Sequence, residues 1–133
     1  MSDFIDATSY DLLMGRWSRP LGLELVRFLG LEPGARIVDV GCGTGSLSAA
    51  FLATARPAQV VGVDPSPTFV ELARSRIQHP RARFETGDAQ ELEFEDGSFD
   101  CTAAMLVLNF VPDRARAAGE MRRVTRADRK SVV

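Results

Sequence analysis

The chain has 133 residues, of which 45% are apolar, so it is long enough for one globular domain with a buried core. Its formal net charge of -2 argues against general binding to nucleic acids or membrane surfaces. No apolar run is long enough to span a bilayer, and the acidic N-terminus MSDFIDATSYD does not resemble a secretory signal. We therefore expect a cytoplasmic protein in which Cys42 and Cys101 stay reduced.

The first predicted helix covers residues 19–30. Leu21, Leu25, Phe28 and Leu29 recur there at helical spacing and are expected on one buried face. A proline–glycine pair follows and ends the helix.

Four short apolar runs alternate with helical segments in the rest of the chain, which predicts an α/β fold. Connections of this length join parallel strands through right-handed crossovers, with helices on both faces of the sheet. Ligands of such sheets bind at the carboxyl ends of the strands, so the site is expected there. The predicted strands are Ala35–Val40, Gln59–Asp64, Arg83–Thr86 and Phe99–Leu108.

A helix is predicted after the first, second and fourth of these strands. Ser66 is a good N-cap with Pro67 in the first helical position, and Asp113 is suited to cap the last helix. The side chains expected to be buried at helical spacing are Leu47, Ala50, Phe51 and Ala55, then Val70, Ala73 and Ile77, then Ala117, Met121 and Val124.

The sharpest functional signal is the turn Gly41-Cys42-Gly43-Thr44-Gly45, which directly follows the first predicted strand. Glycines there allow a tight turn and let a ligand approach the backbone without meeting a Cβ atom. Taken alone, the turn is also compatible with a plain tight connection between a strand and a helix.

Asp64 supports a nucleoside ligand, because it ends the second strand, 19 residues beyond Gly45. An acidic residue in that position can accept hydrogen bonds from both ribose hydroxyls. The alternative is that Asp64 caps the next helix, a role that Ser66 already suits.

The glycine spacing distinguishes between nucleoside ligands. A dinucleotide fold uses G-x-G-x-x-G/A around a pyrophosphate, whereas this turn reads G-x-G-x-G, and Ser46 stands where the third small residue would be. The turn therefore suits a nucleoside with an amino-acid tail, and a nicotinamide-dependent oxidoreductase is the less favoured alternative.

These motifs resemble those of the class I S-adenosylmethionine-dependent methyltransferases. VDVGCGTG resembles their motif I, and VVGVDPSP resembles the acidic loop at the end of their second strand. FETGDAQELEFEDGSFD and LNFVPDRARAAGEMRRVTR are similar to the stretches after their third and fourth strands. YDLLMGRWSRPL resembles the N-terminal lid of the ubiquinone-biosynthesis-like, methyltransferase type 11 branch. The resemblance implies a Rossmann-like fold that binds S-adenosylmethionine and transfers its methyl group to a small-molecule acceptor.

The resemblance also assigns cofactor contacts. Asp39 would organise the methionine amino group, Asp64 would hold the ribose hydroxyls, and Pro65 would lie beside the adenine. Asp88 would accept a hydrogen bond from the adenine amine, and the N–H of Ala89 would meet a ring nitrogen. The implied contact set is Tyr10, Arg16, Trp17, Asp39, Gly41, Cys42, Gly43, Gly45, Asp64, Pro65, Asp88 and Ala89.

The N-terminal lid would close over the site, with Arg16 pairing with the cofactor carboxylate. For Tyr10 and Trp17, plain packing of the segment is an equal alternative. Asn109 and Phe110, at the exit of the fourth strand, are expected to line the acceptor pocket.

The sequence assigns no catalytic or metal-binding residue. His79 enters the third strand from its amino end, which is the wrong edge of the sheet, so we interpret it as structural or exposed. One histidine and two separated cysteines make no metal ligand set.

The end of the sequence departs from the family pattern, because Ala127-Asp128-Arg129-Lys130 replaces the usual turn and fifth strand. We therefore expect a lid at 1–18, a cofactor-binding domain at 19–126, a divergent tail at 127–133, and a shortened fold that lacks the last three strands. The sheet order would be 3-2-1-4. An apolar fourth strand at the edge would favour a homodimer through that edge. A non-catalytic cofactor-binding or dimeric interaction module is the alternative to an enzyme.

Overall fold

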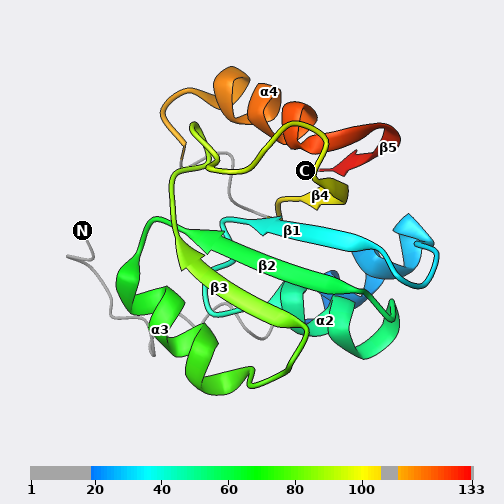
Figure 1. Ribbon diagram of the computed structural model, residues 1–133. Coiled ribbons are helices and arrows are strands. Elements are labelled where there is room, and N and C mark those ends of the chain that lie inside the picture. The colour runs from blue at the N-terminus through cyan, green and yellow to red at the C-terminus, as the bar shows by residue number, and fades with distance from the viewer. Residues whose placement is uncertain (1–18, 106–110, 133) are drawn as a thin grey trace.

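The computed structural model describes residues 19–105 and 111–132, and it contains a five-stranded sheet with helices on both faces (Figure 1). The strand order is β3-β2-β1-β4-β5, and each neighbouring pair is parallel. This arrangement confirms the predicted Rossmann-like α/β fold. The strands are β1 (Arg36–Val40), β2 (Gln59–Asp64), β3 (Ala82–Thr86), β4 (Phe99–Ala103) and β5 (Thr125–Val132).

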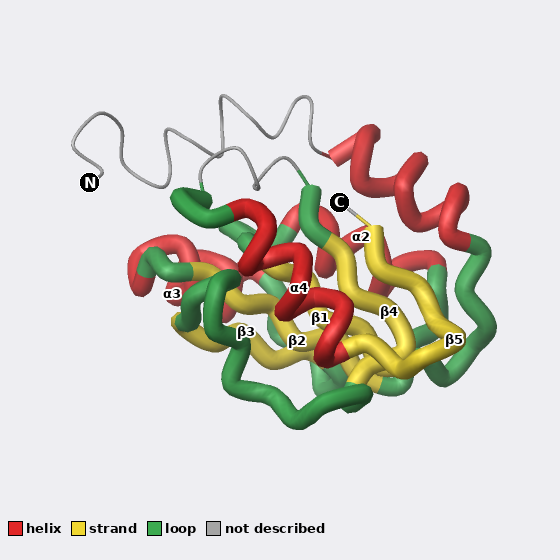
Figure 2. The backbone as a smooth tube through the Cα atoms, turned by 90° about the horizontal axis from the view of Figure 1, so that it is seen from above, coloured by secondary structure: helices red, strands yellow, loops and turns green. Residues whose placement is uncertain are grey.

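The helices form a layer on each side of the sheet. The pair α2 (Ser46–Thr54) and α3 (Pro67–Arg76) lies on one face, and α4 (Arg114–Val124) lies on the other (Figure 1). Figure 2 looks down on α4, which lies over the sheet. A further helix covers residues 19–29. No helix in the described ranges is both long enough and apolar enough to cross a membrane.

The core divides into three clusters, one under α2 and the 19–29 helix, one under α4 and one under α3. Successive residues of β2 serve opposite faces of the sheet. Val60 packs in the first cluster with Phe51, whereas Val61 packs in the second with Met121. Both sides of the central strands are thus covered, which is why their sequences are almost uninterrupted apolar runs.

The predicted helix caps are confirmed. The Ser66 hydroxyl accepts a hydrogen bond from the N–H of Phe69, and Pro67 is the first residue of α3. The carboxylate of Asp113 accepts from the N–H of Arg116 at the start of α4. Both caps are encoded within four residues of sequence, so they could be recognised locally.

Two linked predictions are wrong, that the fourth strand lies at an edge and that all of the last three strands are missing, because a fifth strand is present. β5 pairs with β4 along its outer side, and residues 127–132, expected to form a divergent tail, belong to this strand. The register between Phe99 and Cys101 contains an irregularity, where several residues of β5 oppose a short stretch of β4. Because β4 has neighbours on both sides, its edge is not available for the proposed homodimer.

The predicted face of the first helix is confirmed for Leu29 and for the partly buried Leu25, and it is wrong for Leu21 and Phe28. Phe28 is 81% exposed and Leu21 is 43% exposed, whereas Val26 and Leu29 are buried. Gly22 is also buried, and it lies on the side of the helix that packs against α2, where a Cβ atom would be 3.7 Å from the Cβ of Ala50.

Arg123 joins α4 to the segment that follows β3. Its guanidinium donates to the carbonyl oxygens of Leu92 and Phe94, at 2.8 Å each, and to the carboxylates of Asp96 and Glu120. Glu120 in turn accepts the N–H of Leu92 at 2.8 Å. A guanidinium can hold several oxygens at once because its N–H donors lie in a rigid plane. This contact fixes the path of the chain past the end of β3.

Gly62 of β2 should be the least replaceable glycine of the sheet. A Cβ atom there would lie 2.5 Å from the Cδ1 atom of Phe84 and 3.0 Å from the Cβ of Cys42. We expect Gly62→Ala to lower the free energy of unfolding by about 1–3 kcal/mol, as overpacking commonly does. Gly119→Ala is the matched control, because nothing lies within 4 Å of its Cβ position in α4. This second change should raise stability by about 0.5–1 kcal/mol. Urea unfolding measures both, and equal effects would contradict the packing argument.

Candidate cofactor site

The glycine-rich turn joins the end of β1 to the end of β2. The N–H groups of Gly41 and Cys42 both donate to the carbonyl oxygen of Val63, at 2.7 and 3.0 Å. Gly41, Gly43 and Gly45 have φ angles of 70°, 55° and 99°, which residues with a side chain rarely adopt. The turn therefore lies against β2 at the carboxyl edge of the sheet, where ligands of such folds bind.

Two glycines of this turn have different roles. A Cβ atom at Gly45 would lie 2.5 Å from the Cδ1 atom of Ile77, so this glycine allows α3 to pack closely. A Cβ atom at Gly43 would meet no atom within 4 Å. Packing therefore does not require a glycine at position 43, where the backbone is open to a ligand.

Asp64 is buried next to this turn and anchors it. One carboxylate oxygen accepts the N–H of Gly43 and the other accepts the N–H of Ser66, both at 2.9 Å. Burial raises the pKa of Asp64, and these two bonds oppose the rise. The bond to Ser66 gives the helix-capping alternative partial support, while Ser66 itself caps the helix. Each carboxylate oxygen can accept a second bond, so a ribose can still be held.

Asp39 is only 1% exposed and lies on β1 beneath the turn. Its carboxylate accepts the hydroxyl of Ser48 at 2.7 Å. Burial raises the pKa of Asp39 to about 7, although the bonds from Ser48 lower it, and the nearby Asp64 raises it further. Sequence reasoning missed Ser48. In the sequence, Ser48 is only a polar residue among the apolar residues of α2, and this does not identify Asp39 as its partner.

Asp88 and Ala89 follow β3, whose last residue, Thr86, lies beside Asp64 in the sheet register. The N–H of Gly87 donates to the carbonyl oxygen of Asp64 at 3.0 Å, so Asp88 is brought close to the glycine turn. Asp88 is exposed and Ala89 is partly exposed, as expected of groups that can reach a ligand. Pro65 is exposed at the end of β2.

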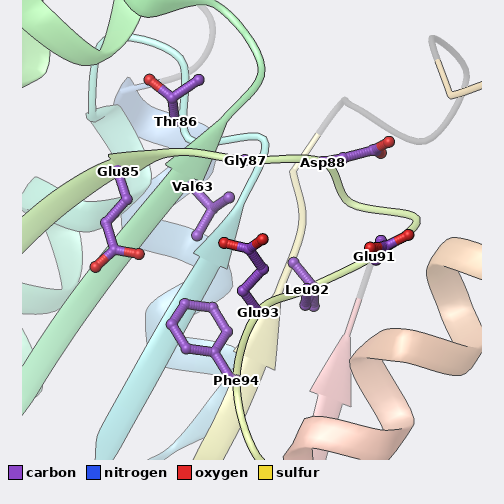
Figure 3. A pocket seen from close by; sticks show the side chains of 9 residues that line it. All are labelled: Val63, Glu85, Thr86, Gly87, Asp88, Glu91, Leu92, Glu93 and Phe94. Atoms are coloured by element: carbon purple, nitrogen blue, oxygen red, sulfur yellow. The ribbon is translucent and has the colours of Figure 1, made fainter.

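A cavity of about 270 Å³, not expected from the sequence, lies beside the end of β3 (Figure 3). Asp88 borders it, but its side chain points away from Val63 and Glu93. No residue of the glycine turn lines the cavity, and four of its nine lining residues are acidic, which disfavours a phosphate group there. The lining residues are Val63, Glu85, Thr86, Gly87, Asp88, Glu91, Leu92, Glu93 and Phe94.

The remaining predicted residues divide into two groups. His79 is exposed just before β3, where its Nδ1 atom accepts the N–H of Arg81 at 3.0 Å, so its assignment to the wrong edge of the sheet is confirmed. Both cysteines are buried and not joined in a disulfide, and they pack in separate clusters. Tyr10, Arg16, Trp17, Asn109 and Phe110 lie outside the described residues.

The buried Asp39 predicts a specific dependence of stability on pH. Its pKa is about 7 in the fold, whereas the ordinary pKa of an aspartate is 3.8. The folded state therefore holds a proton that the unfolded state releases, and stability falls as the pH rises through this window. Asp39→Asn removes this titration while Asp64 remains in both proteins. Between pH 4 and 7 the unmodified chain should therefore lose stability relative to the variant. The difference in unfolding free energy, variant minus unmodified chain, should rise by up to about 1.4 kcal/mol per pH unit. Urea titrations at several pH values test this, and a constant difference would contradict it.

Comparison with known proteins agrees with this geometry. A family model described as Methyltransferase domain matches residues 38–132, which include the glycine turn, Asp64 and Asp88. The chain is 34% identical over 137 residues to the ubiquinone/menaquinone biosynthesis C-methyltransferase UbiE of Citrifermentans bemidjiense. That match covers 96% of the chain and 58% of UbiE. The chain thus spans about half the length of the curated relatives it matches.

Two solved structures have the same fold. The protein bound to the Trm112 methyltransferase activator of Haloferax volcanii is 27% identical, with a TM-score of 0.81, over 90% of this chain and 53% of that chain. The [4+2]-cyclase SpnF is 30% identical, with a TM-score of 0.74, over 81% of this chain and 41% of that chain. With its ordered motifs, sheet topology and family match, the chain belongs to the methyltransferase type 11 branch of the class I S-adenosylmethionine-dependent methyltransferases.

Proposed function

We propose that the protein binds S-adenosylmethionine at the carboxyl edge of β1 and β2 and transfers its methyl group to a small-molecule acceptor. One observation carries the proposal. The backbone at Gly43 faces open space, while Gly43 itself is bonded to the buried carboxylate of Asp64. A nucleoside placed there would meet a bare backbone and a ribose acceptor together.

The residues around the turn fit such a ligand. Asp64 would accept the ribose hydroxyls with the oxygen positions left free by Gly43 and Ser66. Asp39, next to Asp64, would favour the methionine ammonium group through its negative charge, directly or through water.

The adenine would lie on the β3 side of the turn. Pro65 and Asp88 are exposed there, and the N–H of Ala89 follows directly. Gly41, Cys42 and Gly45 would complete the contact surface by shaping the turn. Tyr10, Arg16 and Trp17 remain predicted lid contacts.

When bound, the cofactor supplies an activated sulfonium methyl group, so the chain needs chiefly to orient the acceptor and exclude water. His79, the single histidine of the sequence, lies at the opposite edge of the sheet, so it is not proposed as a general base.

The UbiE relative is a C-methyltransferase, which supports a small-molecule acceptor. The Trm112 complex shows that a protein of this fold can work with an activator subunit, so a bound activator is a second candidate partner. The two cysteines, which form no disulfide, support a reducing, cytoplasmic location.

A second candidate function follows from the SpnF structure, whose fold serves a cyclase. In that case the cofactor site would bind ligand without methyl transfer. The discriminating assay supplies S-adenosylmethionine labelled in the methyl group with a panel of quinone and phenol acceptors. Labelled product supports methyl transfer, and cofactor binding without product with any acceptor supports the alternative.

Asp64 should contribute strongly to cofactor affinity. We expect Asp64→Ala to weaken binding of S-adenosylmethionine and of its demethylated product by about tenfold or more, because a charged hydrogen-bond partner is lost. Isothermal titration calorimetry measures this. Glu32→Ala, an exposed carboxylate just before β1, is the control and should bind normally. An equal effect of both changes, or no binding at millimolar ligand, would contradict the proposal.

Gly43 provides a sharper steric test. We expect Gly43→Ala to weaken binding of the demethylated product at least about tenfold, because the new methyl group occupies space meant for the ligand. Gly34→Ala is the matched control, since Gly34 has a φ of 90° and nothing within 4 Å of its Cβ position, but lies before β1. Both variants carry backbone strain, so only a ligand at Gly43 makes their affinities differ. Equal affinities would place the ligand elsewhere.

A further inference from the structure

Asp88 is held by the residue two positions further along the chain. Its Oδ1 atom accepts the N–H of Gln90 at 2.8 Å and the side-chain Nε2 atom of Gln90 at 3.3 Å. Within the described ranges, the second oxygen of Asp88 has no partner and stays free to accept from a ligand. An exposed aspartate would otherwise rotate freely, so these two bonds select one direction for the carboxylate.

Gln90 is itself fixed from the opposite side by the start of α4. Its Oε1 atom accepts the N–H of Asp113 at 2.9 Å, and its carbonyl oxygen accepts the Nε atom of Arg116 at 2.8 Å. Arg116 also pairs with Glu91 at 3.4 Å. Since α4 is anchored by buried side chains such as Met121, the amide of Gln90 has a rigid support.

These contacts determine the orientation of the Gln90 amide. If the amide were reversed, its NH₂ group would face the N–H of Asp113, and its oxygen would face the carboxylate of Asp88. Only the observed orientation satisfies both neighbours. The donor that faces Asp88 is therefore a consequence of the contact with α4.

We propose that Gln90 is a positioning residue that links the start of α4 to Asp88 and directs the Asp88 carboxylate toward the amine of a bound purine. The inference rests on the proposed function, in which Asp88 recognises adenine. It adds that selectivity for an amino-purine over an oxo-purine depends on a residue that need not touch the ligand.

The test compares two ligands that differ at that position: S-adenosylhomocysteine and its inosine counterpart, in which a carbonyl oxygen replaces the amine. A carboxylate accepts from the amine and repels the carbonyl. Calorimetry gives the ratio of the two dissociation constants, and the unmodified chain should favour the adenine ligand. Asp88→Asn should remove most of this preference.

Gln90→Glu is the informative change, because it keeps the acceptor for Asp113 but replaces the donor facing Asp88 with a second carboxylate. The base preference should fall about tenfold, the scale of one hydrogen bond to a charged group. Gln90→Ala removes the donor without repulsion and should lower the preference by a smaller factor, about threefold. Gln78→Glu is the control. It makes the same charge change on an exposed residue just after α3, where the amide donates to the carbonyl oxygen of Ser75, and it should leave the preference unchanged. Urea midpoints of all variants show that the fold is retained.

The outcomes distinguish a failure of the positioning role of Gln90 from a failure of the proposed function. If Asp88→Asn removes the base preference and Gln90→Glu retains it, the positioning role of Gln90 is wrong and the proposed function stands. If Asp88→Asn leaves the preference intact, Asp88 does not read the base and the inference fails. If the unmodified chain binds neither ligand, the proposed function fails, and the inference fails with it.

Discussion

The candidate site depends on two hydrogen bonds to one atom, the carbonyl oxygen of Val63. It accepts N–H groups from both Gly41 and Cys42, so the chain leaving β1 must turn across the end of β2 before α2 begins. This turn requires positive φ angles, which explains the glycines. It also places Gly43 against Asp64, and Asp64 against the start of α3. One acceptor thus brings together groups from two strands and two helices.

Much of this arrangement follows from local sequence. The strand β2 was predicted with its observed bounds, and Ser66 and Asp113 were recognised as caps, because these signals lie within a few neighbouring residues. β5 was missed because TRADRKSV has no apolar pattern. A strand at a sheet edge is held by backbone hydrogen bonds to one neighbour, and these leave little trace in side-chain composition.

The residues of the candidate site divide in the same way. The glycine turn and Asp64 can be recognised in the sequence, because the turn fixes their type and spacing. Ser48 and Gln90 cannot, since the fold brings their hydrogen-bond partners to them, Asp39 for one and Asp113 for the other. Part of the face of the first helix was also misjudged. Hydrophobicity favoured Phe28, which is exposed, whereas the side that packs includes Gly22 and Val26.

The charges beneath the turn indicate what kind of ligand it favours. Asp39 and Asp64 are both buried, and burial raises the pKa of each, so ionising both carboxyl groups costs desolvation free energy. A ligand that brings positive charge offsets this cost, whereas a pyrophosphate would add to it. The cationic sulfonium and ammonium groups of S-adenosylmethionine fit this requirement, and the anionic phosphates of a dinucleotide do not. The glycine spacing and the buried carboxylates thus both disfavour the nicotinamide alternative, the first on steric grounds and the second on electrostatic grounds.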